Sequence, residues 1–167
     1  MLVSPSLISD YMRCPRKVYW KIHGYPRITS WNKQAIDRGT TVHEIIEEYY
    51  KGDHESKTLT EIKMTLADIY HNKVIMHDEL IEKELSSFAN FEVFRKEHGY
   101  RIVGVEKELK LEYKGNTIYG RADLVMQRGQ DLTVVDWKTG HNGIVSDDIR
   151  RQISIYMYML GASEGIV

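Results

Sequence analysis

An acid and a lysine stand two residues apart at the end of an apolar run, at Asp136 and Lys138. In a β-strand, residues i and i+2 point to the same face, so the two charges are expected side by side, with Trp137 on the opposite face. A carboxylate and an ammonium are costly to desolvate together at the end of a buried strand. A chance ion pair on a surface strand is the simpler interpretation, and this stretch alone leaves both open.

Two more carboxylates, Glu106 and Asp123, lie on the two preceding strands that the sequence predicts. Asp123 and Asp136 fall on adjacent strands and can meet at one end of the sheet, where converging acids repel unless a cation lies between them. Mg²⁺ or Mn²⁺ is the simplest such cation, because both accept oxygen ligands. An imidazole from His43, on a predicted helix, would favour Mn²⁺ slightly.

These carboxylates, a divalent cation and Lys138 together have the layout for phosphodiester hydrolysis. A bound metal lowers the pKa of a water molecule, orients it and neutralises charge in the transition state. A lysine next to the metal would stabilise an attacking hydroxide or a phosphoryl oxygen. Cysteine catalysis has no support, because Cys14 adjoins Pro15 with no evident base, and the chain has neither a P-loop nor a dinucleotide-binding glycine motif.

The first hundred residues are predicted to be mostly helical. Apolar residues recur at helical spacing in four segments, at residues 6–12, 15–23, 40–50 and 59–97. Gly39 precedes the third segment, which carries His43 and ends near Gly52. The fourth segment reads as a structural insert or cap, and its stripe of Phe88, Phe91 and Phe94 indicates core packing rather than a ligand box.

The period of the apolar pattern changes from 3.6 to 2 after Gly99, which predicts a β-meander over about residues 101–138. Its strands span residues 101–113, 117–126 and 132–138, with turns between them. A polar loop at 139–146 precedes a last helix that starts at Asp147 with acids in its first turn. Residues 161–167 leave little room for another strand. The fold class is therefore α/β (α+β).

Composition is that of a soluble globular protein, with 167 residues, 42% hydrophobic and 28% charged. No apolar run reaches the roughly 20 residues that span a bilayer, the N-terminal residues lack the basic and long apolar regions of a signal peptide, and the lone Cys14 suits a reducing compartment. A cytoplasmic location and no membrane partner are expected. The formal net charge is −1, yet residues 1–40 are basic, which points weakly to a phosphate-binding surface; an ordinary solvated face is the alternative.

Five short motifs occur in a fixed order: Gly39 with His43, Glu106, Gly120 to Asp123, Asp136 to Gly140, and Gln152 with Tyr156. Together they resemble the PD-(D/E)XK nuclease superfamily, and most closely its RecB-like branch, which includes the CRISPR-associated exonucleases with four cysteines. Residues 4–17 resemble the N-terminus of that branch. The resemblance implies one nuclease domain over residues 1–167, with a restriction-endonuclease-like core at 101–167 and a mixed central sheet flanked by helices.

The resemblance also implies roles for individual residues. His43, Asp123, Asp136 and the main-chain carbonyl of Trp137 would bind the metal, and Lys138 would be the catalytic lysine. Glu106 would either bind the metal or support the residues that bind it. Gln152 and Tyr156 would contact DNA or support the site, with simple packing as the alternative for Tyr156. The basic residues that could follow a DNA strand by phosphate contacts are Arg13, Arg16 and Lys17.

The sequence departs from the four-cysteine relatives in two respects. Only Cys14 is present, and an iron–sulfur cluster needs about four ligands, so none is predicted. The relatives also continue into a further strand where this sequence stops, near Gly165. The chain is therefore a minimal version, a truncated one, or one that completes the C-terminal edge of its sheet through a second copy or a partner protein.

The expected activity is that of a Mg²⁺- or Mn²⁺-dependent deoxyribonuclease, acting as an exonuclease or an endonuclease on single-stranded DNA or DNA ends. DNA repair, recombination, phage genome processing and CRISPR-like adaptation are the processes in which this fold is used, and a phage or viral origin fits them. A non-catalytic subunit that binds nucleic acid or supports assembly is one alternative, and an RNA-cleaving relative is another.

Overall fold

The computed structural model of the chain describes residues 2–25, 33–52, 54–55, 57–73, 78–139 and 145–167. Within these ranges the chain forms six helices and a mixed five-stranded sheet. None of the described helices combines the length and the apolar character needed to cross a bilayer. Residues 140–144, which belong to the predicted polar loop and include the last glycine of the Asp136 motif, lie outside the described residues.

The predicted β-meander is confirmed: β2 (Arg101–Tyr113), β3 (Asn116–Arg128) and β4 (Asp131–Val135) pair in antiparallel order. Two short parallel strands complete the sheet. β1 (Leu2–Val3) pairs with the first part of β3, and β5 (Glu164–Ile166) pairs with β4. The expectation that no strand would follow the last helix is therefore wrong, because three residues suffice for pairing along an existing strand.

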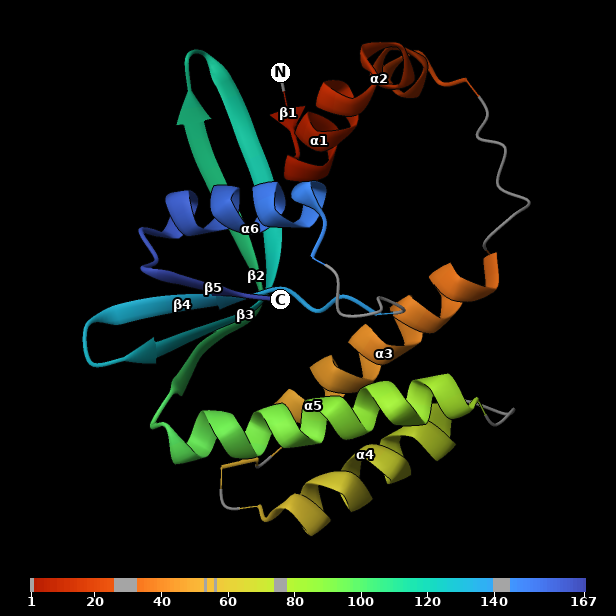
Figure 1. The fold of residues 1–167 in the computed structure, drawn as a ribbon, viewed down its shortest axis with the longest axis vertical. Helices are drawn as coiled ribbons and strands as arrows, with labels where there is room; N and C mark the ends of the chain where they lie inside the picture. Colours follow the sequence, from red (N-terminus) through yellow and green to blue (C-terminus); the bar gives the residue numbers. More distant parts are fainter. Residues whose placement is uncertain (1, 26–32, 53, 56, 74–77, 140–144) are drawn as a thin grey trace.

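Two helices lie at the N-terminal end of the molecule (Figure 1), α1 (Pro5–Arg13) and α2 (Pro15–Ile22). The side chain of Ser4 accepts a hydrogen bond from the backbone N–H of Leu7, and a proline begins each helix, where its missing N–H has no intrahelical partner. Both helices agree with the predicted segments at 6–12 and 15–23.

Three longer helices cover one face of the sheet (Figure 1): α3 (Lys33–Lys51), α4 (Leu59–Lys73) and α5 (Glu79–Glu97). The predicted helical stretch at 59–97 is thus two antiparallel elements. The third predicted helix begins earlier than expected, since α3 starts at Lys33 and contains Gly39. In the phenylalanine stripe of α5, Phe88 is buried and Phe91 half-buried, but Phe94 is 41% exposed.

Helix α6 (Asp147–Leu160) packs on the other face of the sheet. Ser146 caps its N-terminus and Gly161, with a φ of +64°, ends it in the left-handed conformation. Leu124 and Met126 of β3 belong to the core under α3–α5, whereas Ala122 and Val125 belong to the core under α6. The alternation of faces along β3 therefore breaks at Asp123.

Candidate active site

Asp123, in the middle of β3, lies beside Asp136, the first residue after the end of β4. Leu124 of β3 pairs with Val135 of β4, so the residues just beyond that pair are the two acids, and both are buried. β4 ends at Val135 rather than at 138 as predicted, because the next backbone N–H groups bond elsewhere. The N–H of Asp136 donates to the carbonyl of Ile166 at 3.0 Å, and that of Trp137 donates to Asp123 Oδ2 at 2.6 Å.

The environment of Asp123 favours its protonated form. Burial and, after it, the nearby charge of Asp136 raise the pKa of this carboxyl from 3.8 to about 7, against the opposing effect of the hydrogen bond from the Trp137 backbone. An acid with so high a pKa in a metal-free site marks a place where negative charge is crowded and poorly solvated. A cation bound there would relieve both costs.

Glu106 lies on β2 between residues that pair with Leu124 and Ala122, and so stands opposite Asp123. Its φ of +47° is in the left-handed region, which costs a residue with a side chain about 1–3 kcal/mol. Its Oε2 atom lies 2.7 Å from Nε of Arg121. Burial raises the pKa of Glu106, against the opposing charge of Arg121. A strained backbone thus presents a half-buried carboxylate toward Asp123.

His43 reaches the site from α3. Its Nδ1 lies 3.6 Å from Asp123 Oδ1, too far for a hydrogen bond. Burial, together with the charge of Lys138, lowers the pKa of His43 below its usual 6.5, so the ring is neutral at pH 7 and the two groups form no ion pair. A neutral imidazole is the form that binds metals.

Gly39 explains how α3 comes so close to the loop after β4. A Cβ at this position would lie 3.0 Å from Oγ1 of Thr139. The helix therefore packs its backbone, one turn before His43, against the loop that carries Asp136 and Lys138. This close approach accounts for a glycine in the middle of a helix, where it costs about 1 kcal/mol relative to alanine.

The residues present fit a divalent cation. One ligand atom each from His43, Glu106 and Asp123 can be chosen so that all lie within 4.8 Å of one another. The buried oxygens Glu106 Oε2 and Asp136 Oδ2 accept no aligned hydrogen bond from the described residues, although each has a cationic neighbour. Two carboxylates and an imidazole, with the carboxylate of Asp136 on the neighbouring segment, are a donor set suited to Mg²⁺ or Mn²⁺.

Asp136 is held from two directions. Its Oδ2 lies 2.5 Å from Lys138 Nζ, as the spacing of the two residues predicts, and its Oδ1 lies 3.3 Å from Nε2 of Gln152 on α6. The Gln152 amide also lies 3.1 Å from the hydroxyl of Tyr156. The Tyr156 ring lies over Gly120, where a Cβ would be 2.5 Å from Cε1 of the ring. Three of the five motifs therefore meet around this one carboxylate.

Trp137 points away from these charges and anchors the loop in the helical layer. Its ring makes edge contacts with Phe88 and Phe91 of α5, with centroid distances of 5.5 and 4.8 Å. The sequence predicts that this phenylalanine stripe belongs to the core, but it does not predict the contact between the stripe and Trp137. The link depends on tertiary packing, for which the sequence carries no local signal.

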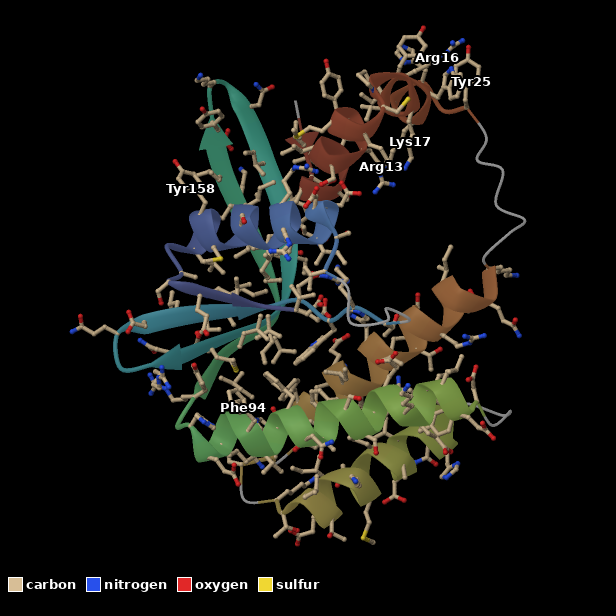
Figure 2. The ribbon with its side chains drawn as sticks, in the orientation of Figure 1. Arg13, Arg16, Lys17, Tyr25, Phe94 and Tyr158 are labelled. Carbon is tan, nitrogen blue, oxygen red and sulfur yellow. The ribbon has the colours of Figure 1, made fainter. Side chains whose placement is uncertain are left out.

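The predicted basic residues are not part of this cluster but lie on α1 and α2. Arg13 forms an ion pair with Asp148 of α6, Lys17 Nζ lies 2.5 Å from Asp10, and the Arg16 guanidinium lies 5.0 Å from the centre of the Trp20 ring. Arg13 and Lys17 project from the underside of these helices in Figure 2, and Arg16 belongs to the first turn of α2.

One residue beside the cluster, Arg121, was missed. The signal was available in the hairpin register, because pairing β2 with β3 through the turn at Lys114–Gly115 places Glu106 opposite Asp123 and hence near Arg121.

The family model of the PD-(D/E)XK nuclease superfamily matches residues 2–166. A comparison with curated protein sequences found no match. The mixed sheet, covered by α6 on one face and by α3–α5 on the other, agrees with the restriction-endonuclease-like fold that the sequence predicted. With the match extending over nearly the whole chain, and with its acids and lysine gathered at one end of that sheet, the chain belongs to the PD-(D/E)XK nuclease superfamily.

Proposed function

We propose that the chain is a Mg²⁺- or Mn²⁺-dependent nuclease that hydrolyses DNA phosphodiester bonds. The observation that carries this proposal is the convergence of His43, Glu106 and Asp123 beside the Asp136–Lys138 pair. A structural ion pair would need only one acid and one base. Three acids, two of them with raised pKa values, need a cation to balance them.

In this proposal His43, Asp123 and Asp136 hold the metal, with the carbonyl of Trp137, and Glu106 joins them as ligand or support. When bound, such a metal activates a water molecule and neutralises charge on the phosphate. Lys138 places its ammonium beside Asp136, where it would meet the attacking oxygen or a phosphoryl oxygen. Gln152 fixes the orientation of the Asp136 carboxylate, and Tyr156 supports Gln152.

Single-stranded DNA or DNA ends are the substrates that the N-terminal helices favour. Arg13, Arg16 and Lys17 would contact phosphates there, and exposed aromatic residues, Tyr19 and Trp20 among them, offer flat surfaces on which unpaired bases stack. The motif order supports a RecB-like nuclease working in repair, recombination, phage genome processing or CRISPR-like adaptation. A second copy or a partner protein could add a strand at β5.

The test is cleavage of end-labelled single-stranded and duplex DNA, and of RNA of the same sequence, with Mn²⁺, Mg²⁺ or EDTA. Asp136→Asn should lower the rate by about 100-fold or more, because a neutral amide binds a divalent cation far more weakly than a carboxylate does. Asp131→Asn, an exposed acid at the start of β4, is the matched control and should cleave like wild type. Cleavage in EDTA, or undiminished cleavage by Asp136→Asn, would contradict the proposal.

A further inference from the structure

Arg121 lies at the edge of the acidic cluster, and neither the proposed metal site nor the proposed hydrolysis step uses it. Its Nε lies 2.7 Å from Glu106 Oε2, and Glu106 shares the cluster with His43 and Asp123. The two partners differ in exposure, since the Glu106 side chain is 16% exposed and that of Arg121 is 63% exposed. The guanidinium therefore extends from a protected carboxylate into solvent.

The positive charge of Arg121 argues against a role in which this residue only supports the metal site. A positive charge this close to Glu106 opposes binding of a metal cation, and the same charge already lowers the pKa of His43. Among the described residues, Glu106 is the one acid within ion-pair distance of Arg121. An arginine that weakens the metal site while remaining exposed must act on something else that approaches the site.

We propose that Arg121 binds a phosphate of the substrate strand beside the metal centre, with Glu106 as the anchor that orients it. A guanidinium carries five N–H donors in a rigid planar fork. The ion pair with Glu106 lies on the Nε side of the fork and leaves its terminal nitrogens for phosphate oxygens, which arginine binds in bidentate geometry. This inference rests on the proposed nuclease function and adds a substrate-contacting residue to it.

The arrangement places one positive group on each of two neighbouring segments, Arg121 in β3 and Lys138 in the loop after β4. Lys138 is paired with the buried Asp136 and is itself 26% exposed, whereas Arg121 is more than twice as exposed and paired with Glu106. Lys138 is thus close to the reacting oxygen in the proposed mechanism, and Arg121 is placed to hold the strand. The β2–β3 hairpin supplies both Arg121 and its anchor, so the contact is built on a rigid element.

The experiment compares Arg121→Ala and Arg121→Lys with Lys110→Ala. Lys110 is the matched control, because it is 69% exposed on the same hairpin and also pairs with an acid, Glu112. Mn²⁺ affinity is measured by calorimetry, and affinity for a fluorescent single-stranded oligonucleotide is measured in EDTA over a range of salt concentrations. Cleavage is then measured as kcat/KM with Mn²⁺.

Arg121→Ala should bind Mn²⁺ at least as tightly as wild type, bind the oligonucleotide about 3- to 10-fold more weakly, and lose about 0.7–0.9 from the salt slope, which is one phosphate contact. The kcat/KM of Arg121→Ala should fall about 10-fold or more. Arg121→Lys keeps the positive charge but lacks the planar fork of donors, so its kcat/KM should lie between those of wild type and Arg121→Ala.

Oligonucleotide binding, salt slope and cleavage equal to those of Lys110→Ala would overturn the inference. A loss of Mn²⁺ affinity in Arg121→Ala would also overturn it, because it would show that the residue serves only to position Glu106. Failure of the nuclease proposal has a different signature: wild type itself would neither bind Mn²⁺ nor cleave, whatever residue stands at position 121.

Discussion

The backbone N–H of Trp137 donates a 2.6 Å hydrogen bond to Oδ2 of Asp123, which joins the loop after β4 to the middle of β3. This bond ends the strand pairing of β4 and turns the two flanking residues, Asp136 and Lys138, toward the acids of the neighbouring strands. The Trp137 ring is then fixed from the opposite side by α5. One residue therefore connects the charged site with the apolar layer beneath it.

The raised pKa of Asp123 predicts a pH dependence of stability in the metal-free protein. In EDTA the folded state takes up a proton near pH 7, whereas the unfolded state does so near its usual value of 3.8. The folded state thus binds more protons between these values, and this group makes folding more favourable as the pH falls through 7. From about pH 8 to about pH 6 the gain is about 1.4 kcal/mol in the free energy of unfolding.

Urea unfolding at both pH values measures this gain. Asp123→Asn lacks the titrating group and should show a pH difference smaller than that of wild type by about this amount, since groups remote from the site contribute equally to both proteins. Identical pH differences for the two proteins would show that the Asp123 carboxyl titrates normally.

The contact between Gln152 and Asp136 predicts that the glutamine positions a metal ligand. Gln152→Ala should lower both Mn²⁺ affinity and kcat by about 10- to 100-fold, as is usual for residues that orient ligands. Ser154→Ala is the control, because its hydroxyl bonds only the Arg150 carbonyl on the exposed side of the same helix. If Gln152 acted on DNA alone, Mn²⁺ affinity in calorimetry would stay at the wild-type value.

Packing of Phe91 against Trp137 predicts that the helical layer controls the position of the loop that carries Asp136 and Lys138. Phe91→Leu keeps an apolar side chain but removes the edge contact with the indole, so cleavage should fall about 10-fold while the free energy of unfolding changes by about 1–2 kcal/mol. Phe94→Leu is the control on the same helix, since Phe94 is exposed and its ring lies against His98 and Tyr100.

Fluorescence reports the same contact. In a Trp20→Phe, Trp31→Phe background, in which Trp137 is the one indole, Phe91→Leu should shift the emission to longer wavelength and Phe94→Leu should not. An unchanged spectrum together with unchanged cleavage would mean that α5 does not position the loop.

Close packing between Gly39 and Thr139 predicts a specific rescue. Gly39→Ala brings a Cβ to 3.0 Å from Oγ1 of Thr139, so the loop must shift and cleavage should fall several-fold, although alanine favours the helix by about 1 kcal/mol. Adding Thr139→Ala removes Oγ1 and should return most of the activity. Equal losses with and without Thr139→Ala, in cleavage rates measured side by side, would show that the two residues do not meet.

Much of the fold is visible in the sequence because its signals are local. Alternation along residues 101–113 and the turn at Lys114–Gly115 predict the β2–β3 hairpin, and proline and serine mark the starts of α1, α2 and α6. The start of α3 was missed because a glycine inside a helix reads as a boundary. β5 was missed because three residues carry no periodicity, and its pairing depends on the exposed edge of β4.

The site was predictable to a similar extent. Motif order brought His43, Asp123, Asp136 and Lys138 together, and the structure places them at one end of the sheet. The conformation of Glu106 was not predictable, since a positive φ at a glutamate is imposed by its neighbours rather than by its type. The contact of Phe91 with Trp137 arises between distant elements and appears only when the chain is folded, whereas that of Arg121 with Glu106 follows from the hairpin register.

The most direct test of the metal site is anomalous scattering from crystals of the wild-type protein soaked in Mn²⁺. We predict one strong peak between His43, Asp123 and Asp136, within bonding distance of carboxylate and imidazole atoms, and its loss in crystals of Asp123→Asn. A peak that avoids these residues, or the same peak in Asp123→Asn, would contradict the account.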